Sequence, residues 1–124
     1  MRKKIQLKNT EKRDEELILH TEEDFSFSDL RATGQVIVDS DALSFVYLAE
    51  SDDEFIYLYI PESIWGDIHT AIQQNLIVKA VSGDTEMILE NIQDELGYLI
   101  ENIEGNSNYG EEMVNKVETI FLSK

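Results

Sequence analysis

The sequence predicts an α+β domain in which a largely antiparallel sheet of about six or seven strands is packed by three helices. Two apolar runs alternate with a period of two, which is typical of strands. Three later stretches carry apolar residues at helical spacing, near 62–74, 91–104 and 109–122. At 124 residues the chain is expected to form one domain spanning 1–124.

The two alternating runs, 43–49 and 55–60, are expected to lie at the centre of the sheet. Both of their faces are apolar, as in strands that are covered on both sides. The acidic break between them, 50–54, has the length of a hairpin loop. These runs and the helix that follows form the most hydrophobic part of the chain, so we expect the core here.

Pro61 ends the second run and suits the first turn of a helix. Apolar residues then follow at helical spacing, and the stripe is expected to lie on the sheet: Ile64, Trp65, Ile68, Ala71 and Ile72. Gly66 interrupts this helix at a cost of about 1 kcal/mol relative to Ala. A close approach of helix to sheet is the reason we expect for it.

The N-terminal third predicts short strands in a meander-like antiparallel order. Residues 3–8 are interpreted as an edge strand whose lysines discourage further pairing. Residues 17–20 and 25–28 are interpreted as the second and third strands. Residues 29–34 are expected to connect these to a strand at 36–38.

The C-terminal half predicts a hairpin followed by two helices. Residues 76–81 and 85–89 flank Ser-Gly-Asp, an ordinary turn sequence. Asn91 is a candidate N-cap for the first helix, and Gly105 is placed to be its C′ residue. Asn108, with an acid three residues later, is a candidate cap for the last helix.

Charge is the main global property of the chain. The net charge is −16, but residues 1–13 carry a net of +5 and residues 14–124 a net of −21. Such a field repels nucleic acid and anionic membranes and attracts basic partners, although acidity also serves solubility alone. The chain has no cysteine, no apolar run long enough to span a membrane and no signal-peptide pattern, so a cytoplasmic protein is expected.

Few residues point to catalysis. His20 and His69 stand alone at spacings that fit no zinc site or catalytic triad, so both are interpreted as structural. Asp39-Ser40-Asp41 is similar to the DxD pairs that hold a divalent metal in nucleotide-sugar enzymes, although a strand-ending turn is the simpler interpretation. We therefore expect a non-enzymatic protein with no catalytic residues, no cofactor and no metal site.

Two surface features are candidates for binding. Three tyrosines could form an aromatic platform, for which core or partner contact is the better interpretation on an acidic protein: Tyr47, Tyr57 and Tyr59. The loop 105–110 is rich in Gly and Asn, as in an anion-binding nest, although an interhelical turn explains the same composition. Its candidate ligand or interaction residues are Gly105, Asn106, Asn108, Tyr109 and Gly110.

Three segments carry a resemblance over nearly the whole chain. They are VDSDALSFVYL at 38–48, FIYLYIP at 55–61 with the following Trp65, and YLIENIEGNSNYGEE at 98–112. Together they resemble the YjbL-like proteins, an uncharacterised family of the UPF series from Bacillus-type bacteria. The resemblance implies a cytoplasmic bacterial protein and a defined loop at 105–110, and it supplies no catalytic residue.

The leading functional hypothesis is a protein–protein interaction or regulatory module that docks a basic protein through its acidic surface, without binding nucleic acid or membrane. The alternative is a small-ligand-binding or regulatory domain that uses the loop 105–110. A third hypothesis, a metal-assisted enzyme, depends on Asp39 and Asp41. The oligomeric state is left open.

Overall fold

Seven strands and three α-helices make up the computed structural model, which describes residues 3–122. The strands are β1 (Lys3–Arg13), β2 (Glu16–Thr21), β3 (Arg31–Asp39), β4 (Ser44–Glu50), β5 (Phe55–Pro61), β6 (Ile77–Ser82) and β7 (Thr85–Ile88). The helices are α1 (Trp65–Gln74), α2 (Ile92–Ile103) and α3 (Glu111–Phe121), with short 3₁₀ turns η1 (Glu62–Ile64) and η2 (Ser107–Tyr109).

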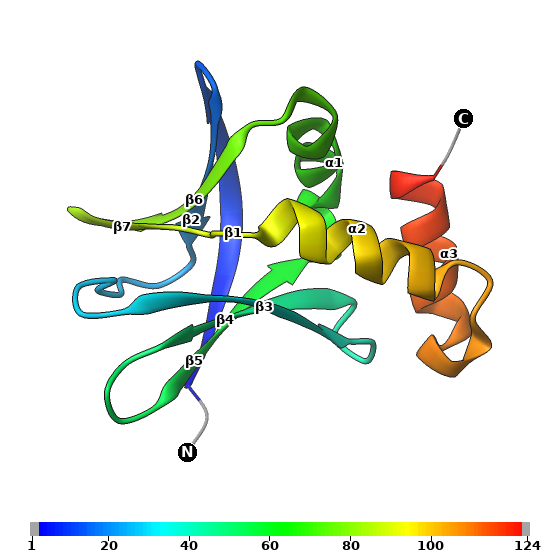
Figure 1. The fold of residues 1–124 in the computed structure, drawn as a ribbon, viewed down its shortest axis with the longest axis horizontal. Coiled ribbons are helices and arrows are strands. Elements are labelled where there is room, and N and C mark those ends of the chain that lie inside the picture. The colour runs from blue at the N-terminus through cyan, green and yellow to red at the C-terminus, as the bar shows by residue number, and fades with distance from the viewer. Residues whose placement is uncertain (1–2, 123–124) are drawn as a thin grey trace.

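The strands form one curled sheet in the order β3-β4-β5-β1-β2-β6-β7 (Figure 1). Four neighbouring pairs are antiparallel, so the predicted α+β class with a largely antiparallel sheet is confirmed. The pairs β1–β5 and β2–β6 are parallel, which makes the sheet mixed. The first and last strands in this order, β3 and β7, approach each other as the sheet curls.

The prediction that residues 3–8 form an edge strand is wrong. β1 lies in the middle of the sheet, where its first half pairs with β5 and its second half with β2. Its register shifts between Leu7 and Asn9, where the strand passes from one partner to the other. Ile5 and Leu7 point into the core, while Lys4 is exposed on the opposite face. Lys4 therefore marks the solvent-facing side of a central strand.

The strand predicted at 25–28 is also absent, and the chain there is irregular. The backbone N–H of Phe25 donates to Ser82 Oγ at 2.9 Å, and that of Phe27 donates to Thr85 Oγ1 at 3.0 Å. Side chains of the β6–β7 hairpin thus satisfy groups that a sheet ladder would otherwise use. The predicted meander fails with it, because β3 begins at Arg31, inside the expected connection, and pairs with β4 instead of β2.

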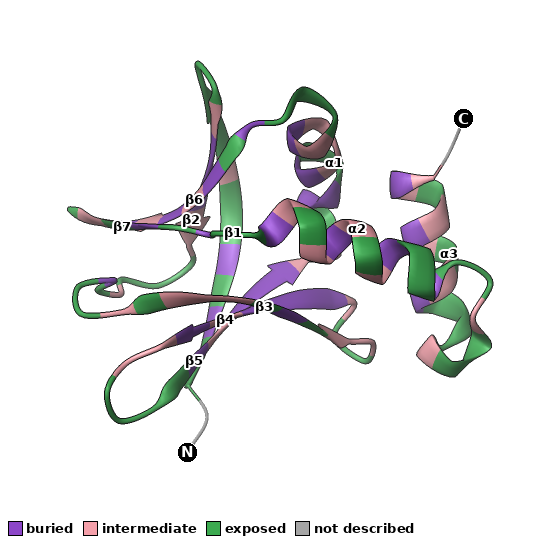
Figure 2. Cartoon of the chain, in the orientation of Figure 1, coloured by how far each residue is buried: buried purple, intermediate pink, exposed green. Residues whose placement is uncertain are grey.

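The core lies between the curled sheet and the helices, as predicted for β4, β5 and α1. Figure 2 shows that the buried residues gather on the inner side of the strands and on the helix faces turned toward them. Trp65 is fully buried and donates its indole N–H to the carbonyl of Ile60 at 2.9 Å. Its ring lies 5.0 Å from the ring of Phe45 and 5.8 Å from that of Phe121, which ties α3 to α1 and β4.

Four residues form a seam of hydrogen bonds that joins β3 and β4 to the start of α2: Gly34, Tyr47, Glu90 and Asn91. Tyr47 Oη donates to the carbonyl of Glu90 at 2.6 Å and accepts from the backbone N–H of Gly34 at 3.2 Å. Asn91 Nδ2 donates to the carbonyl of Gly34 at 3.2 Å. Asn91 does stand at the N-cap position of α2, but its side chain makes no capping bond because it reaches β3.

The end of α2 follows the prediction, whereas the cap predicted for α3 and the role predicted for Gly66 do not. Gly105 follows α2 with φ +65°, the left-handed backbone expected of a C′ residue. Gly110 stands at the N-cap of α3, so the cap predicted from Asn108 is wrong. Gly66 is exposed, and a Cβ placed there meets nothing within 4 Å, which contradicts the close helix–sheet approach expected for it.

No helix within residues 3–122 is long and apolar enough to cross a membrane.

Candidate functional site

The loop 105–110 joins α2 to α3 through the single turn η2, and it keeps the five predicted residues together. Most of its backbone amides donate within the protein. The N–H of Gly105 donates to Glu118 Oε2 at 2.8 Å, and that of Asn108 donates to Asn106 Oδ1 at 3.0 Å. The N–H groups of Asn106, Tyr109 and Gly110 donate to backbone carbonyls at 2.9–3.1 Å. These amides hold the turn together and are not aimed at an external anion.

The carboxylate of Asp39 is engaged by its own turn and by β5. Its Oδ1 accepts from the backbone N–H of Ala42 at 3.2 Å, and its Oδ2 accepts from Tyr59 Oη at 2.9 Å. Asp41 follows on the exposed part of the turn. Within residues 3–122 no three His, Cys, Asp or Glu side chains are grouped in a way that could hold a metal ion. Asp39 therefore orders the end of β3, as the simpler interpretation of the DxD pattern has it.

The two histidines lie in different surroundings. His20 Nε2 lies 3.2 Å from Glu11 Oε1 on the outer side of β1 and β2, where Arg13 Nε also contacts Glu11 at 2.7 Å. These two contacts lower the pKa of the Glu11 carboxyl, the Arg13 hydrogen bond most strongly. The ring of His69 packs edge-on against Phe121, with centroids 5.7 Å apart. His20 thus belongs to a surface polar cluster with Glu11 and Arg13, and His69 to the aromatic packing around Phe121.

The three tyrosines do not form one platform. In the antiparallel register Tyr47 lies opposite Leu58, whereas Tyr57 lies opposite Leu48. Residues directly opposite share a face, so Tyr47 points inward while Tyr57 points outward. Tyr47 is fully buried, and burial raises the pKa of its phenol to about 12. The sequence shows all three tyrosines in alternating runs, but it does not indicate which face of each strand is buried.

The outward side chains of three strands form a surface that sequence reasoning missed. We call it the outer β3–β5 face and define it by five residues: Ile37, Val46, Leu48, Phe55 and Tyr57. Ile37 is 43% exposed and Phe55 48% exposed, which is high for apolar residues within strands. A hollow of about 330 Å³ opens beside Ile37 and is lined also by Val46 and the turn at 39–41.

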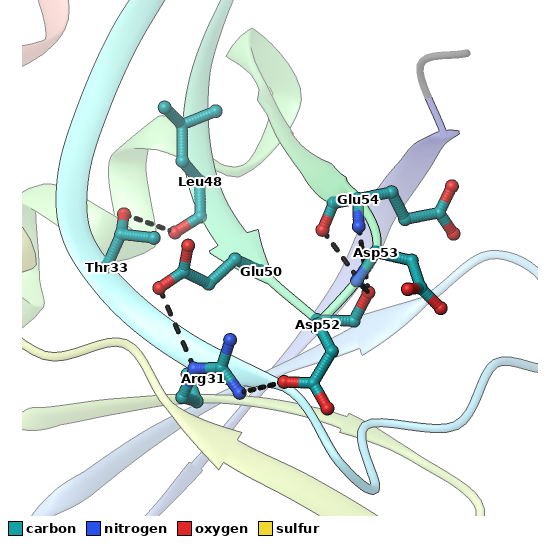
Figure 3. A network of polar contacts seen from close by, with 8 residues as sticks. Arg31, Thr33, Leu48, Glu50, Asp52, Asp53 and Glu54 are labelled. Atoms are coloured by element: carbon teal, nitrogen blue, oxygen red, sulfur yellow. Dashed lines mark hydrogen bonds and ion pairs between the residues drawn. The ribbon is translucent and has the colours of Figure 1, made fainter.

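An ionic cluster stands at the far end of this face, where β4 turns into β5 (Figure 3). Arg31 Nε lies 3.7 Å from Glu50 Oε1, and its Nη1 lies 3.1 Å from Asp52 Oδ1. Ser51 closes the turn, because its Oγ accepts from the N–H of Asp53 at 3.3 Å and of Glu54 at 3.2 Å. Figure 3 shows the carboxylates of Asp53 and Glu54 directed away from Arg31.

Charge is segregated between elements. β1 carries five of the basic residues that the structure describes: Lys3, Lys4, Lys8, Lys12 and Arg13. The hairpin of α2 and α3, residues 92–121, carries seven acids and one lysine. That lysine, Lys116, lies 3.7 Å from Glu62 and is thus engaged outside the hairpin. The hairpin thus has a net charge of −6, and the rest of the acidic excess lies in residues 14–91, which carry 18 acids and two basic residues.

Comparison with known proteins gives a family and no activity. Residues 5–121 match the model of a family of unknown function, UPF0738. A UPF0738 protein of Bacillus cereus is 46% identical over 98% of this chain and 100% of its own length. UPF0738 proteins of a second Bacillus cereus strain and of Bacillus thuringiensis are 45% identical with the same coverage. No solved structure matches this chain.

Proposed function

This chain belongs to UPF0738, a family of unknown function with members in Bacillus, as its resemblance to an uncharacterised family of such bacteria implied. From this premise and from the charge segregation we propose that it is a non-enzymatic, cytoplasmic interaction module that docks a basic protein. The acidic hairpin α2–α3 is the docking surface in this proposal. The observation that carries it is the seven acids of residues 92–121 against one engaged lysine.

The acidic side chains of the hairpin face solvent. Its acids stand at exposed or half-buried positions, while the apolar stripes of α2 and α3 face the core: Ile92, Leu96, Ile100 and Ile103 on one helix, Met113, Val117 and Phe121 on the other. Exposed carboxylates separated by less than about 8 Å reinforce one another at physiological ionic strength. Such a surface raises the association rate of a basic partner and rejects polyanions.

Tyr98 gives this surface an anchor. It lies on α2 and is 65% exposed, the largest exposed fraction among the bulky apolar and aromatic residues of the described chain. Asp94 and Glu101 flank it one turn before and one turn after. An aromatic ring between carboxylates binds lysine or arginine side chains through both ion pairing and cation–π attraction. Tyrosine is also enriched among the residues that dominate binding energy at interfaces.

The first experiment is affinity capture from the lysate of a related bacterium, washed in parallel at about 150 mM and about 500 mM salt. We expect a near-stoichiometric basic protein that is retained at the lower salt and lost at the higher. An empty capture at both concentrations, or a partner whose binding is independent of salt, would contradict the proposal.

A charge-matched pair of variants separates location from net charge. The hairpin variant neutralises four exposed acids: Glu101→Gln, Glu104→Gln, Glu111→Gln and Glu112→Gln. The control variant neutralises four exposed acids elsewhere: Asp14→Asn, Glu15→Gln, Glu23→Gln and Asp24→Asn. We expect the hairpin variant alone to lose the partner. Equal loss in both variants would mean that net charge, and not this surface, governs binding.

The alternative function, a small-ligand site in the loop 105–110, has a separate test. The exposed side chains of Ser107 and Asn108 favour it, although most of the amides of the loop are already engaged. A metabolite library screened by thermal shift should then contain a compound that raises the Tm of the wild type and not that of an Asn106→Ala, Tyr109→Phe variant. If no compound shifts the Tm, the alternative has no support.

A further inference from the structure

The outer β3–β5 face is an interaction surface separate from the hairpin. Neighbouring strands place its side chains together: Ile37 lies opposite Val46, and Leu48 lies opposite Tyr57. Phe55 continues the same face at the start of β5, opposite Glu50. The side chains between them, such as Phe45 and Leu58, point inward and fill the core. Strand alternation therefore gives one sheet two apolar faces, of which only the inner one is covered by the helices.

The five residues of this face are covered unequally: Val46 is buried and Leu48 and Tyr57 are partly buried, whereas Ile37 and Phe55 are exposed. Figure 1 shows the three helices grouped at one side of the curled sheet, away from the free side of β4 and β5. Ile37 and Phe55 keep 43% and 48% of their surface in contact with solvent. Exposed apolar side chains that are contiguous across strands mark interaction sites on soluble proteins. Burial of this patch against an apolar partner would be favourable.

Acidic turns lie at both ends of the face. Asp39 and Asp41 stand in the turn between β3 and β4, beside the hollow next to Ile37. The turn from β4 to β5 carries a further set of acids: Glu50, Asp52, Asp53 and Glu54. Arg31 contacts Glu50 and Asp52, which leaves an excess of negative charge at that end too (Figure 3). Lys4 borders the face on the β1 side, with its Nζ 5.5 Å from the centre of the Tyr59 ring.

The length of the face sets the size of an occupant. The seven residues of β4 separate the two acidic turns. At a rise of about 3.3 Å per residue they span about 20–23 Å. An α-helix rises about 1.5 Å per residue, so one of about 14–16 residues spans the same distance. The hollow beside Ile37, about 330 Å³, is large enough for one side chain of such a helix, and its lining combines apolar residues with Asp39 and Asp41.

We propose that the outer β3–β5 face binds an amphipathic helix of a partner protein, about 14–16 residues long, with an apolar stripe and Lys or Arg at both ends. The stripe contacts Ile37, Leu48 and Phe55, and the basic ends meet the two acidic turns. A second copy of this chain does not fit, because it brings a net charge of −16 and the same acids at both ends of its own face.

The test uses a synthetic peptide as the probe. It has about 16 residues, leucines at i, i+3, i+4, i+7 and i+11, a lysine pair at each end and a fluorescent label. Its affinity for the wild-type protein is measured by fluorescence anisotropy. Two control peptides are a scrambled sequence of the same composition and a version with glutamates in place of the terminal lysines. We expect the probe to bind at least tenfold more tightly than either control.

Variants of the protein then locate the peptide. Ile37→Ser with Phe55→Ser should weaken binding at least tenfold, whereas Tyr98→Ser on α2 should leave it unchanged. Neutralising Asp53 and Glu54 to Asn and Gln should weaken binding at low salt and have little effect at high salt. Both altered strand residues are exposed, and the fluorescence of the buried Trp65 reports whether each variant is folded.

Three outcomes would contradict the proposal. Equal affinity for the probe and the scrambled peptide would show that the apolar stripe is not recognised. Undiminished binding to the folded Ile37→Ser, Phe55→Ser variant would show that the peptide sits elsewhere. Loss of binding in the hairpin variant alone would place the peptide on α2–α3, which supports the proposed function while rejecting this surface.

Discussion

Removal of one hydroxyl group tests the seam between β3 and α2. In the Tyr47→Phe variant the carbonyl of Glu90 and the N–H of Gly34 lose the partner that lies 2.6 Å and 3.2 Å away. A part-buried polar group left without a partner costs about 1–2 kcal/mol. The ring keeps its packing, so no cavity term is added. We therefore expect the free energy of unfolding to fall by about 1–2 kcal/mol and the Tm by roughly 3–10 °C.

Urea denaturation measures this change, with the fluorescence of Trp65 as the signal. Trp65 is the one tryptophan of the chain and is fully buried, so its emission reports loss of the core. Tyr98→Phe is the matched control, because Tyr98 is 65% exposed and its loss should change stability by less than about 0.5 kcal/mol. A Tyr47→Phe change as small as the control's would refute the reasoning.

A double-mutant cycle separates the seam from general strand packing. Asn91→Ala removes the second link of the seam, from Asn91 Nδ2 to the carbonyl of Gly34 at 3.2 Å. Because both side chains bond the same residue of β3, the two substitutions should not be additive, with a coupling energy of about 0.5 kcal/mol or more. Additive effects would show that the two links act independently.

Three further predictions follow from the same structure. The pKa of Tyr47 is raised to about 12 in the folded protein, above the unfolded value of about 10, so the neutral phenol contributes its full stabilisation of the fold below pH 10 and loses it as pH rises toward 12. In urea melts over that interval, the free energy of unfolding of the wild type should fall by about 2–3 kcal/mol more than that of Tyr47→Phe. Gly97→Ala, inside α2 where a Cβ meets nothing within 4 Å, should raise stability by up to about 1 kcal/mol, whereas Gly105→Ala at φ +65° should lower it by about 1 kcal/mol. A change in Tm of the same sign for both variants in thermal melts would contradict this account. Glu118→Ala removes the acceptor 2.8 Å from the Gly105 N–H and should lower stability by about 1 kcal/mol and speed amide exchange at Gly105, and unchanged exchange would show that this bond does not hold the turn.

Periodicity predicted the faces of the strands but not their neighbours. Ile5 and Leu7 point inward as their alternation with lysines indicated. That alternation is the same for an edge strand and for a central strand with one solvated face, so it could not place β1 between β5 and β2. The two parallel pairs join segments distant in sequence, and no local pattern encodes them.

The strand predicted at 25–28 is absent because side chains of another segment bind the backbone N–H groups that a neighbouring strand would bind. Phe25 and Phe27 alternate with serines as in a strand, yet their amides bond Ser82 and Thr85 of a later hairpin. Asn91 shows the same effect, because its side chain bonds Gly34 across the seam instead of capping α2. Hydrogen bonds between residues more than 50 positions apart decide both cases, and a local window does not contain the second partner.

The surfaces were only partly predictable. The excess of acids was visible in composition, but which acids share the solvent-facing sides of α2 and α3 required the helix boundaries. The outer β3–β5 face was hidden for another reason. Runs 43–49 and 55–60 are apolar on both faces, which predicts strands covered on both sides. Only the structure shows that Phe55 at the start of β5, and Ile37 on the neighbouring β3, remain exposed on the outer face.

The position of β1 has a consequence for how the chain folds. Lys3 of β1 pairs with Ile56 of β5, so the first half of the first strand to be synthesised waits for a segment made much later. Pairings of such long sequence separation slow folding, because the loop must close before the contact is gained. During synthesis on the ribosome, Ile5 and Leu7 therefore remain uncovered until β5 has emerged. Chains released before that point would expose the apolar, unpaired first half of β1 to chaperones and proteases.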